Sequence, residues 1–130
     1  MTIPKVPPTV LIVDDQEFMF RILQATLKSQ AIRISAARSG EAALSHIEKY
    51  GAPDAIILDF GMPEMDGLDT LRLIRNLPCG KKIPVLMLTA NDQTNIRNEA
   101  EGLNIHAFMT KPFGPNALLN TVKEMLESGK

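Results

Sequence analysis

The sequence Ile56-Ile57-Leu58-Asp59 places three apolar residues directly before a carboxylate, and the turn-forming run Phe60-Gly61-Met62-Pro63 follows at once. A short apolar run bounded by turn residues is typical of a buried strand, so Asp59 is expected at the carboxyl end of one. A second run, Val10-Leu11-Ile12-Val13, has the same form and ends in Asp14-Asp15. Two buried strands that each end in acid predict a shared acidic pocket.

The composition is that of one folded domain. The 130 residues are 45% hydrophobic and 22% charged, with a net charge of −1, and this length is enough for a single core. The near-zero net charge argues against direct nucleic-acid binding by this domain. No apolar run approaches the ~20 residues of a membrane span. The segment 1–8 lacks the apolar core of a secretory signal, and the single Cys79 fits a reducing compartment. We therefore expect a cytoplasmic protein without membrane contact.

Apolar runs alternate with amphipathic stretches along the chain. Strands are expected at Thr9–Asp14, Ile32–Ala36, Asp54–Asp59, Ile83–Thr89 and His106–Thr110. Helices are expected at Gln16 to about Gln30, from a Ser39 cap to Tyr50, from an Asp66 cap to Leu77, from Asp92 to about Gly102, and from Gly114-Pro115 onward. This alternation predicts a single-domain α/β fold, a doubly wound (βα)5 arrangement with a five-stranded parallel sheet of the flavodoxin-like type. The domain is expected to span 9–127, after a flexible tail at 1–8 and before a terminus or linker start at 128–130.

Polar side chains follow several of these strands. In doubly wound sheets the functional crevice lies beyond the carboxyl ends of the strands, where we expect Asp14, Asp15, Asp59, Thr89 and Lys111. Like-charged carboxylates at about 4 Å repel by roughly 4 kcal/mol at an effective dielectric near 20, so protonation or a bound cation must relieve them. Oxygen ligands suit Mg²⁺, and a Lys and a Thr beside it can hold a phosphoryl group. A carboxylate in such a site can attack phosphorus, and Asp59 is the predicted nucleophile.

Each of these residues taken alone has an ordinary structural role. Asp14-Asp15 could cap a helix, Asp59 could form a turn, Thr89 could be a strand-end hydroxyl, and Lys111 could be solvated. Their joint placement at successive strand ends argues against four independent coincidences. Both histidines are expected to be structural or exposed, because no second His or Cys lies at metal-ligand spacing.

The set of motifs resembles the receiver domain of two-component response regulators, of the chemotaxis-regulator type. The resemblance covers about residues 9–127 and rests on Asp14-Asp15, Asp59 followed by Met62-Pro63 and Asp66-Gly67, Thr89-Ala90, and Lys111-Pro112-Phe113. It implies that Asp59 accepts a phosphoryl group from the phosphohistidine of a histidine kinase or phosphotransfer protein. It also implies a cis bond between Lys111 and Pro112.

The resemblance further implies how the site is divided among its residues. Mg²⁺ (or Mn²⁺) would be held by Asp15, Asp59 and the backbone carbonyl of Gly61, and by Asp14 largely through water. Lys111 would pair with the phosphoryl oxygens. Beyond phosphorylating itself and slowly losing the group again, the domain is not expected to be an enzyme.

A switch is also implied by the resemblance. Thr89 would move toward the phosphoryl group, and Phe108 would rotate inward behind it. The surface made by the fourth helix, the fifth strand and the last helix would then change, and that surface could control a partner, an effector domain or a homodimer. Gly61 and Asn91 occupy positions that tune hydrolysis of the acyl phosphate.

Three other functions remain as alternatives. A flavodoxin-like cofactor binder would need a phosphate loop where Asp14-Asp15-Gln16-Glu17 stands, and these acids repel phosphate unless a metal intervenes. A phosphatase would need a general acid at position 61, which is glycine. A receiver acting only as a non-phosphorylated binding module is disfavoured by the intact polar set. Phe20 is expected to be exposed on the first helix, either as an ordinary surface residue or as a docking contact.

Overall fold

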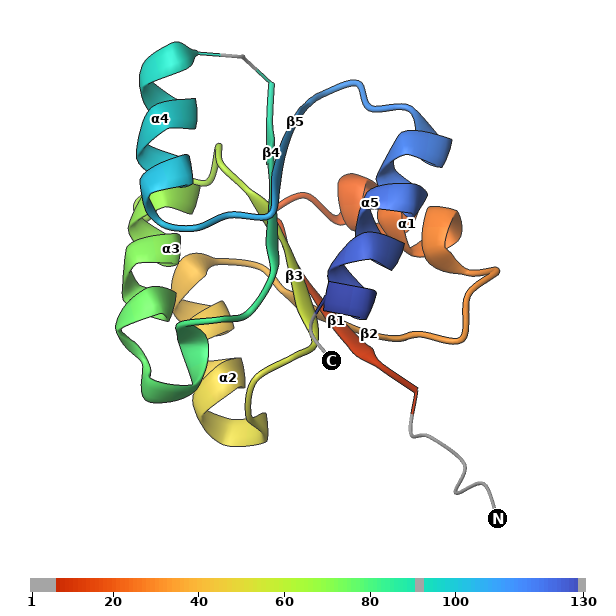
Figure 1. The fold of residues 1–130 in the computed structure, drawn as a ribbon, viewed down its shortest axis with the longest axis horizontal. Helices are drawn as coiled ribbons and strands as arrows, with labels where there is room; N and C mark the ends of the chain where they lie inside the picture. Colours follow the sequence, from red (N-terminus) through yellow and green to blue (C-terminus); the bar gives the residue numbers. More distant parts are fainter. Residues whose placement is uncertain (1–6, 91–92, 129–130) are drawn as a thin grey trace.

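The five strands of the described residues run parallel in one sheet, in the order β2-β1-β3-β4-β5 (Figure 1). The computed structural model describes residues 7–90 and 93–128. The strands are β1 (Thr9–Val13), β2 (Arg33–Ala37), β3 (Ala55–Asp59), β4 (Val85–Thr89) and β5 (Ala107–Thr110). The doubly wound five-stranded fold expected from the sequence is confirmed. Most of the proposed tail, the last two residues and the expected first helical residue Asp92 lie outside the described residues.

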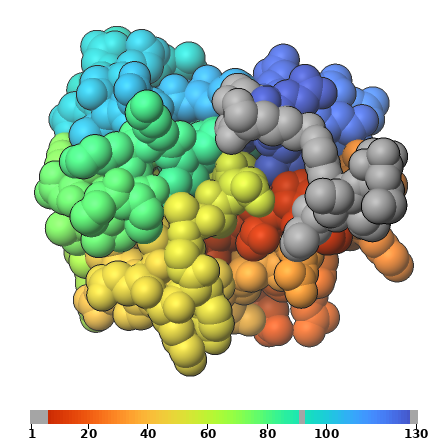
Figure 2. All heavy atoms as spheres, turned by 60° about the horizontal axis from the view of Figure 1, so that its bottom comes forward, coloured from red at the N-terminus to blue at the C-terminus, as the bar shows by residue number. Residues whose placement is uncertain are grey.

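Helices cover both faces of the sheet. They are α1 (Glu17–Leu27), α2 (Gly40–Tyr50), α3 (Gly67–Asn76), α4 (Thr94–Gly102) and α5 (Pro115–Ser128), with a short 3-10 turn η1 (Pro78–Gly80). One face carries α1 and α5, and the other carries α2, α3 and α4 (Figure 1). These last three helices follow one another across the surface seen in Figure 2. None of the helices in the described ranges is both long and apolar enough to cross a membrane.

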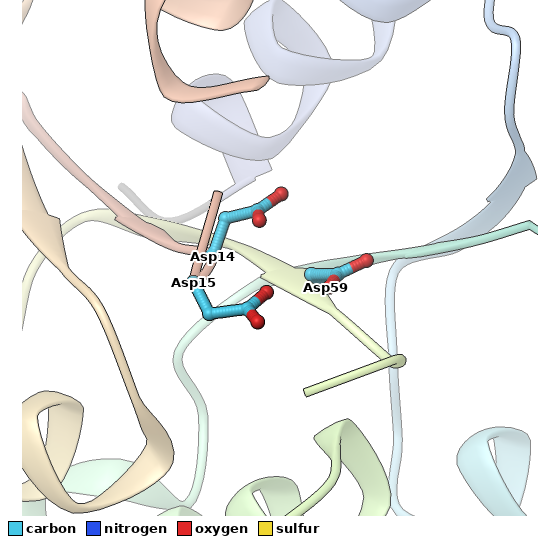
Figure 3. Close-up of side chains that lie close together, drawn as sticks. All are labelled: Asp14, Asp15 and Asp59. Atoms are coloured by element: carbon cyan, nitrogen blue, oxygen red, sulfur yellow. The ribbon is translucent and has the colours of Figure 1, made fainter. Parts of the chain in front are cut away.

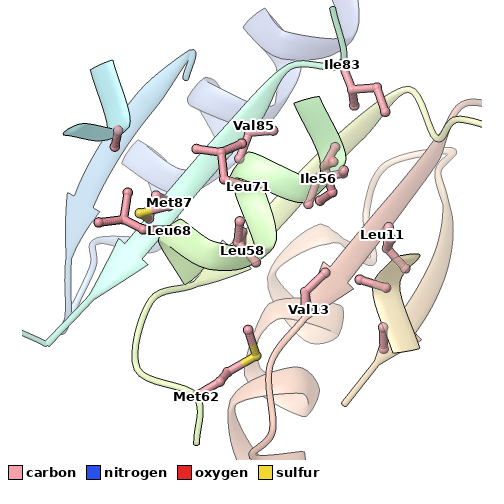
Figure 4. Close-up of a cluster of buried hydrophobic side chains, with 14 of the residues drawn as sticks. Leu11, Val13, Ile56, Leu58, Met62, Leu68, Leu71, Ile83, Val85 and Met87 are labelled. Carbon is pink, nitrogen blue, oxygen red and sulfur yellow. The ribbon is translucent and has the colours of Figure 1, made fainter. Parts of the chain in front are cut away.

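The sheet is buried on both faces, which explains its continuous apolar runs. Successive side chains of a strand point to opposite faces, so Val10 and Ile12 pack toward α1 and α5. Leu11 and Val13 pack toward α2 and α3 instead (Figure 4). Every residue of β3 and β4 is buried, as expected for the interior of a parallel sheet. The core therefore fixes Asp59 at the end of β3, because the strand that carries it has no exposed face.

Helix ends lie where the sequence suggested for α2 and α3. The Ser39 hydroxyl accepts a hydrogen bond from the Ala42 amide at 3.0 Å, and Gly51 ends α2 with a φ of 89°. At the start of α3, Asp66 and Asp69 cap each other's backbone amides at 2.9 and 3.4 Å. Such a reciprocal cap satisfies amides that the first turn leaves unbonded. The expected start of α3 is thus confirmed.

Arg75, near the end of α3, donates hydrogen bonds to four backbone carbonyls. Its guanidinium donates to the carbonyls of Gly80, Ile83 and Leu103, each at 2.8 Å, and to that of Asn104 at 3.1 Å. Burial of this group lowers its pKa from the ordinary value. The contacts to Leu103 and Asn104 join the carboxyl end of α4 to α3.

The expectation for Phe20 is wrong. Its side chain is partly buried and packs with the core under α1 and α5, because it lies three residues before Leu23 and seven before Leu27 and so shares their helix face. The exposed aromatic residue of α1 is Phe18, at 73%.

Candidate functional site

Three carboxylates meet at the carboxyl ends of β1 and β3 (Figure 3). One oxygen from each of Asp14, Asp15 and Asp59 lies within 4.8 Å of the others. The two strands are neighbours, and their register pairs Val13 with Leu58. Asp14 and Asp59, the next residues, therefore lie side by side at the sheet edge. Asp14 is 2% and Asp59 5% exposed, and Asp15 is less buried. The fold brings together the acids that the sequence singled out.

Lys111 is the cation of this pocket. It follows β5, and its ammonium nitrogen lies 2.6 Å from Asp59 Oδ1 and 3.8 Å from Asp14 Oδ2. Its amide donates to the Thr89 carbonyl at 2.7 Å, and the bond between Lys111 and Pro112 is cis, as expected. Among the described residues, one ammonium against three ionised carboxylates gives a formal charge of −2 (+1 − 3). That charge matches a divalent cation.

Two carboxylate oxygens of the pocket have unused bonding capacity. Asp14 Oδ2 and Asp15 Oδ1 are buried, and neither has a hydrogen-bond partner among the described residues. Burial raises the pKa of Asp14, and the charges of Asp59 and Asp15 raise it further, while the Gln16 amide at 2.9 Å and Lys111 act in the opposite direction. Buried oxygens of this kind are costly unless something binds them. The donor set therefore fits a hard cation such as Mg²⁺.

In the loop after Asp59, Gly61 has free space beside it, whereas Gly67 is packed against the backbone. A side chain added at Gly61 would meet no atom within 4 Å, whereas one at Gly67 would lie 2.7 Å from Phe60 Cα and 2.8 Å from the Asp59 carbonyl oxygen. The first turn of α3 thus packs directly on the backbone of Asp59. Sequence reasoning noted Gly67 only as part of a motif, although a glycine straight after a helix cap is a signal of close backbone approach.

Thr89 and Phe108 lie on the adjoining strands. Thr89 ends β4, is 2% exposed, and pairs in register with Thr110. Phe108 lies in β5, is partly buried, and packs on the core under α2, α3 and α4. The Arg97 guanidinium of α4 lies 4.8 Å from the centroid of its ring, a contact that the sequence pattern did not suggest. Asn91 lies outside the described residues.

Comparison with known proteins places this fold and site in a family. Residues 10–123 match the family model described as the response regulator receiver domain. The chain belongs to that family. This receiver domain is 34% identical over 117 residues to the alkaline phosphatase synthesis transcriptional regulatory protein PhoP of Bacillus subtilis, covering 90% of the chain and 48% of that protein. It is 34% identical over 116 residues to the response regulator PleD of Caulobacter vibrioides, covering 89% of the chain and 25% of that protein.

Solved structures of the family superpose over nearly the whole receiver domain. A response regulator structure from Chloroflexus aurantiacus has a TM-score of 0.86 at 35% identity, covering 93% of this chain and 98% of that one. The chemotaxis protein CheY4 of Vibrio cholerae has a TM-score of 0.85 at 30% identity, covering 92% and 99%. The chain spans about half or less of the curated relatives PhoP and PleD. Membership in the family gives the domain a role in phosphorylation-dependent signalling.

Proposed function

We propose that this receiver domain is a signalling switch that accepts a phosphoryl group on Asp59. The observation that carries the proposal is the setting of this carboxylate, which is 5% exposed, next to two further acids, and 2.6 Å from the Lys111 ammonium. An ion pair at that distance orients the carboxylate for attack.

The donor of the phosphoryl group in this proposal is a phosphohistidine on a kinase or phosphotransfer protein. An Asp59 oxygen forms the new bond to phosphorus, and the bond between phosphorus and the imidazole nitrogen breaks, with its electron pair staying on nitrogen. Lys111 then pairs with the phosphoryl oxygens instead of the free carboxylate. Hydrolysis of the acyl phosphate restores Asp59.

The proposed cation is Mg²⁺ (or Mn²⁺), held by Asp15, Asp59 and the carbonyl of Gly61, with Asp14 acting largely through water. The cation, when bound, neutralises charge on the phosphoryl oxygens. The buried oxygens of Asp14 and Asp15 that lack hydrogen-bond partners in the described chain support this ligand set. Gly61 leaves open space beside the site, so its side of the pocket does not shield the acyl phosphate from water. Asn91 remains the second proposed tuning position.

The proposed response is a shift of Thr89 toward the new oxygens, followed by inward rotation of Phe108. The ring of Phe108 is partly buried and lies beneath the Arg97 guanidinium, so its movement would change the contact between β5 and α4. The surface formed by α4, β5 and α5 is therefore the proposed output surface, toward a partner, an effector domain or a second copy of the chain.

Labelling with a small phosphodonor tests the acceptor. We expect intact-mass spectrometry to show one added phosphoryl group when folded protein is incubated with phosphoramidate and Mg²⁺. Asp59→Asn should lower labelling by at least about 100-fold, while Glu48→Gln, an exposed acid on α2, should label like the parent. Failure of the folded parent to label would replace this proposal with a binding module that is not phosphorylated.

Asp14 provides a separate test of the metal site. Its raised pKa means that the folded state holds the proton more tightly than the unfolded state. The metal-free protein therefore loses stability as pH rises from 3.8, the ordinary value, through the raised pKa. At neutral pH we expect Asp14→Asn to raise the free energy of unfolding of metal-free protein by on the order of 1 kcal/mol. The same change should weaken the further stabilisation by Mg²⁺, measured by urea unfolding with and without the ion. A destabilised variant with unchanged Mg²⁺ stabilisation would contradict the proposed role.

Phe18 is the proposed contact for the phosphohistidine-bearing partner. It is 73% exposed in the first turn of α1, and this turn begins two residues after Asp15. We expect Phe18→Ala to slow phosphotransfer from a phosphohistidine protein while leaving labelling by phosphoramidate unchanged. Tyr50→Ala is the matched control, because Tyr50 is also exposed, at 67%, but lies at the end of α2. Equal slowing by both changes would remove the specific role of Phe18.

A further inference from the structure

The outer edge of β2 carries backbone groups that pair with no other strand in the described part of the chain. β2 is the first strand of the sheet and pairs only with β1 among the described strands. The Arg33 amide donates to the Pro8 carbonyl at 2.8 Å, and the Ala37 carbonyl accepts from the Asp14 amide at 3.0 Å. Backbone groups alternate in direction along a strand, so those of the intervening Ile34 and Ala36 point away from β1. Such a row of groups can pair with another strand.

A groove lies on the α1 side of this edge. It has a volume of about 570 Å³, and its lining includes Arg21 of α1, Lys28 just after that helix, and Ile32 and Ile34. The two isoleucines are partly buried and pack on the core beneath α1 and α5. The groove therefore has an apolar floor and a cationic wall.

A second groove lies on the α2 side of the same edge. Its volume is about 580 Å³, and its lining includes Arg33, Ile34, His46 and Tyr50. The His46 and Tyr50 rings are 4.8 Å apart, and His46 Nδ1 is buried without a hydrogen-bond partner in the described chain. Ile34 lines both grooves, so the two grooves meet at the strand edge.

The charges along this edge have one sign. Among the described residues, no Asp or Glu lines either groove, whereas Arg21, Lys28 and Arg33 do. Arg21 is 3.5 Å from Glu17 in an exposed pair, but neither Lys28 nor Arg33 forms an ion pair within the described ranges. Cations that guard a strand edge discourage pairing with ordinary strands, and they favour a strand of opposite charge.

We infer that β2 accepts an extended acidic segment of a partner protein as a sixth strand. Backbone bonds to Ile34 and Ala36 would hold the segment, and its alternate side chains would enter the two grooves, as in other cases of strand addition. Apolar side chains fit the isoleucine floor, and carboxylates fit Lys28 and Arg33. The second groove also includes Thr9 and Pro53, which lie at the amino ends of the strands, so this surface is separate from the pocket at Asp59.

Nuclear magnetic resonance on the full chain tests the inference. The probe is a blocked synthetic peptide, VVEEVVE, which presents both Val and Glu on each face of a strand. We expect it to slow hydrogen exchange at the Ile34 and Ala36 amides, with a dissociation constant on the order of 1 mM or tighter. The matched peptide VVKKVVK should not bind. An acidic peptide with a central proline should bind more weakly, because proline cannot donate to the ladder.

Charge reversal on the protein separates this surface from others. We expect Lys28→Glu with Arg33→Glu to weaken binding of the acidic peptide by at least about tenfold, while Lys123→Glu, on α5, leaves it unchanged. Labelling of Asp59 should be unaffected by all three changes. Three results would each overturn the inference. Chemical-shift changes on peptide addition could lie away from β2, or the acidic and basic peptides could bind equally. Hydrogen exchange at Ile34 could also slow with increasing protein concentration in the absence of peptide. The last result would assign the edge to a second copy of the chain.

Discussion

Helices α3 and α4 cover the same face of the sheet but are held in different ways. Five residues of α3 are buried, and its first turn is closed by the reciprocal cap of Asp66 and Asp69. In α4 only Ile96 and Ala100 are buried, and the side chain of its N-cap residue, Gln93, makes no capping hydrogen bond among the described residues. α3 follows Asp59, the proposed acceptor, and α4 follows Thr89.

This difference separates the part of the site that must stay in place from the part that is proposed to move. A helix with a large apolar face and a closed cap contributes to global stability. A helix with few buried side chains has a lower cost of local opening. We therefore expect α3 to hold the loop that follows the proposed acceptor Asp59, and we expect that α4 could change position without unfolding of the core.

The largest difference in stability is expected when a glycine in each helix is replaced by alanine. Gly67→Ala should lower the free energy of unfolding by about 3 kcal/mol, because its Cβ would lie inside contact distance of the Phe60 and Asp59 backbone. Gly102→Ala, in the last turn of α4, meets open space and should raise stability by about 0.5–1 kcal/mol. Urea unfolding measures both. Equal losses at the two sites would contradict the proposed difference between the helices.

Changes at the two helix caps should have opposite signs. Asp66→Ala removes the side chain that accepts from the Asp69 amide and should cost about 1 kcal/mol. Gln93 has an extended backbone at the N-cap but makes no side-chain cap bond, so Gln93→Ser should stabilise α4 by about 0.5–1 kcal/mol. Hydrogen exchange measures the stability of each helix separately. In Gln93→Ser, slower exchange should be confined to the amides of α4. Slower exchange throughout the protein would show that α4 does not open independently.

The contact between Arg97 and Phe108 should set how readily the ring moves. Arg97→Leu removes the guanidinium and should therefore remove about 0.5–1 kcal/mol of stabilisation from the present ring position in the unphosphorylated state. The ring should then populate its inward position more often, measured by the ¹³C shifts of Phe108 before and after phosphorylation. Arg72→Leu is the control, since Arg72 contacts Glu99 and not the ring. Unchanged ¹³C shifts of Phe108 in Arg97→Leu would show that this contact does not control the position of the ring.

The smallest expected effect is that of the ion pair between α3 and α4. Arg72 binds Glu99, and both side chains are about half exposed, at 46% and 52%. A double-mutant cycle of Arg72→Ala and Glu99→Ala should give a coupling of about 0.2–1 kcal/mol that decreases in high salt. A coupling well above this range would mean that polar contacts hold α4 as firmly as apolar burial holds α3.

The sequence predicted the strands better than the relations between helices. Asp14, Asp15 and Asp59 could be placed together because apolar runs mark buried strands, and parallel strands bring their carboxyl ends to one edge. The caps at Ser39 and Asp66 could be placed because they involve local residue types. The contact between Lys111 and Asp59 followed only as an expectation of proximity, since its 2.6 Å distance depends on side-chain positions.

Contacts between distant segments left no periodic signal in the sequence. Arg97 reaches Phe108 because α4 packs beside β5, and neither residue type predicts that pairing. The expectation that Phe20 is exposed was wrong because the apolar face of α1 is broad enough to include it with Leu23 and Leu27. Helix phase within one turn therefore decided which phenylalanine is exposed.

The four carbonyl contacts of Arg75 bear on the direction in which α4 can move. Two of them hold Leu103 and Asn104, just beyond the last residue of the helix, whereas the first turn has no cap bond. A rod fixed at one end behaves as a lever, and nine residues give it an arm of about 13 Å. A small rotation about the Arg75 contacts would then produce its greatest displacement at the amino end of α4, the end that follows Thr89 in the chain. The Arg75 guanidinium, which joins α4 to α3, would thus be the point about which α4 rotates in the proposed response.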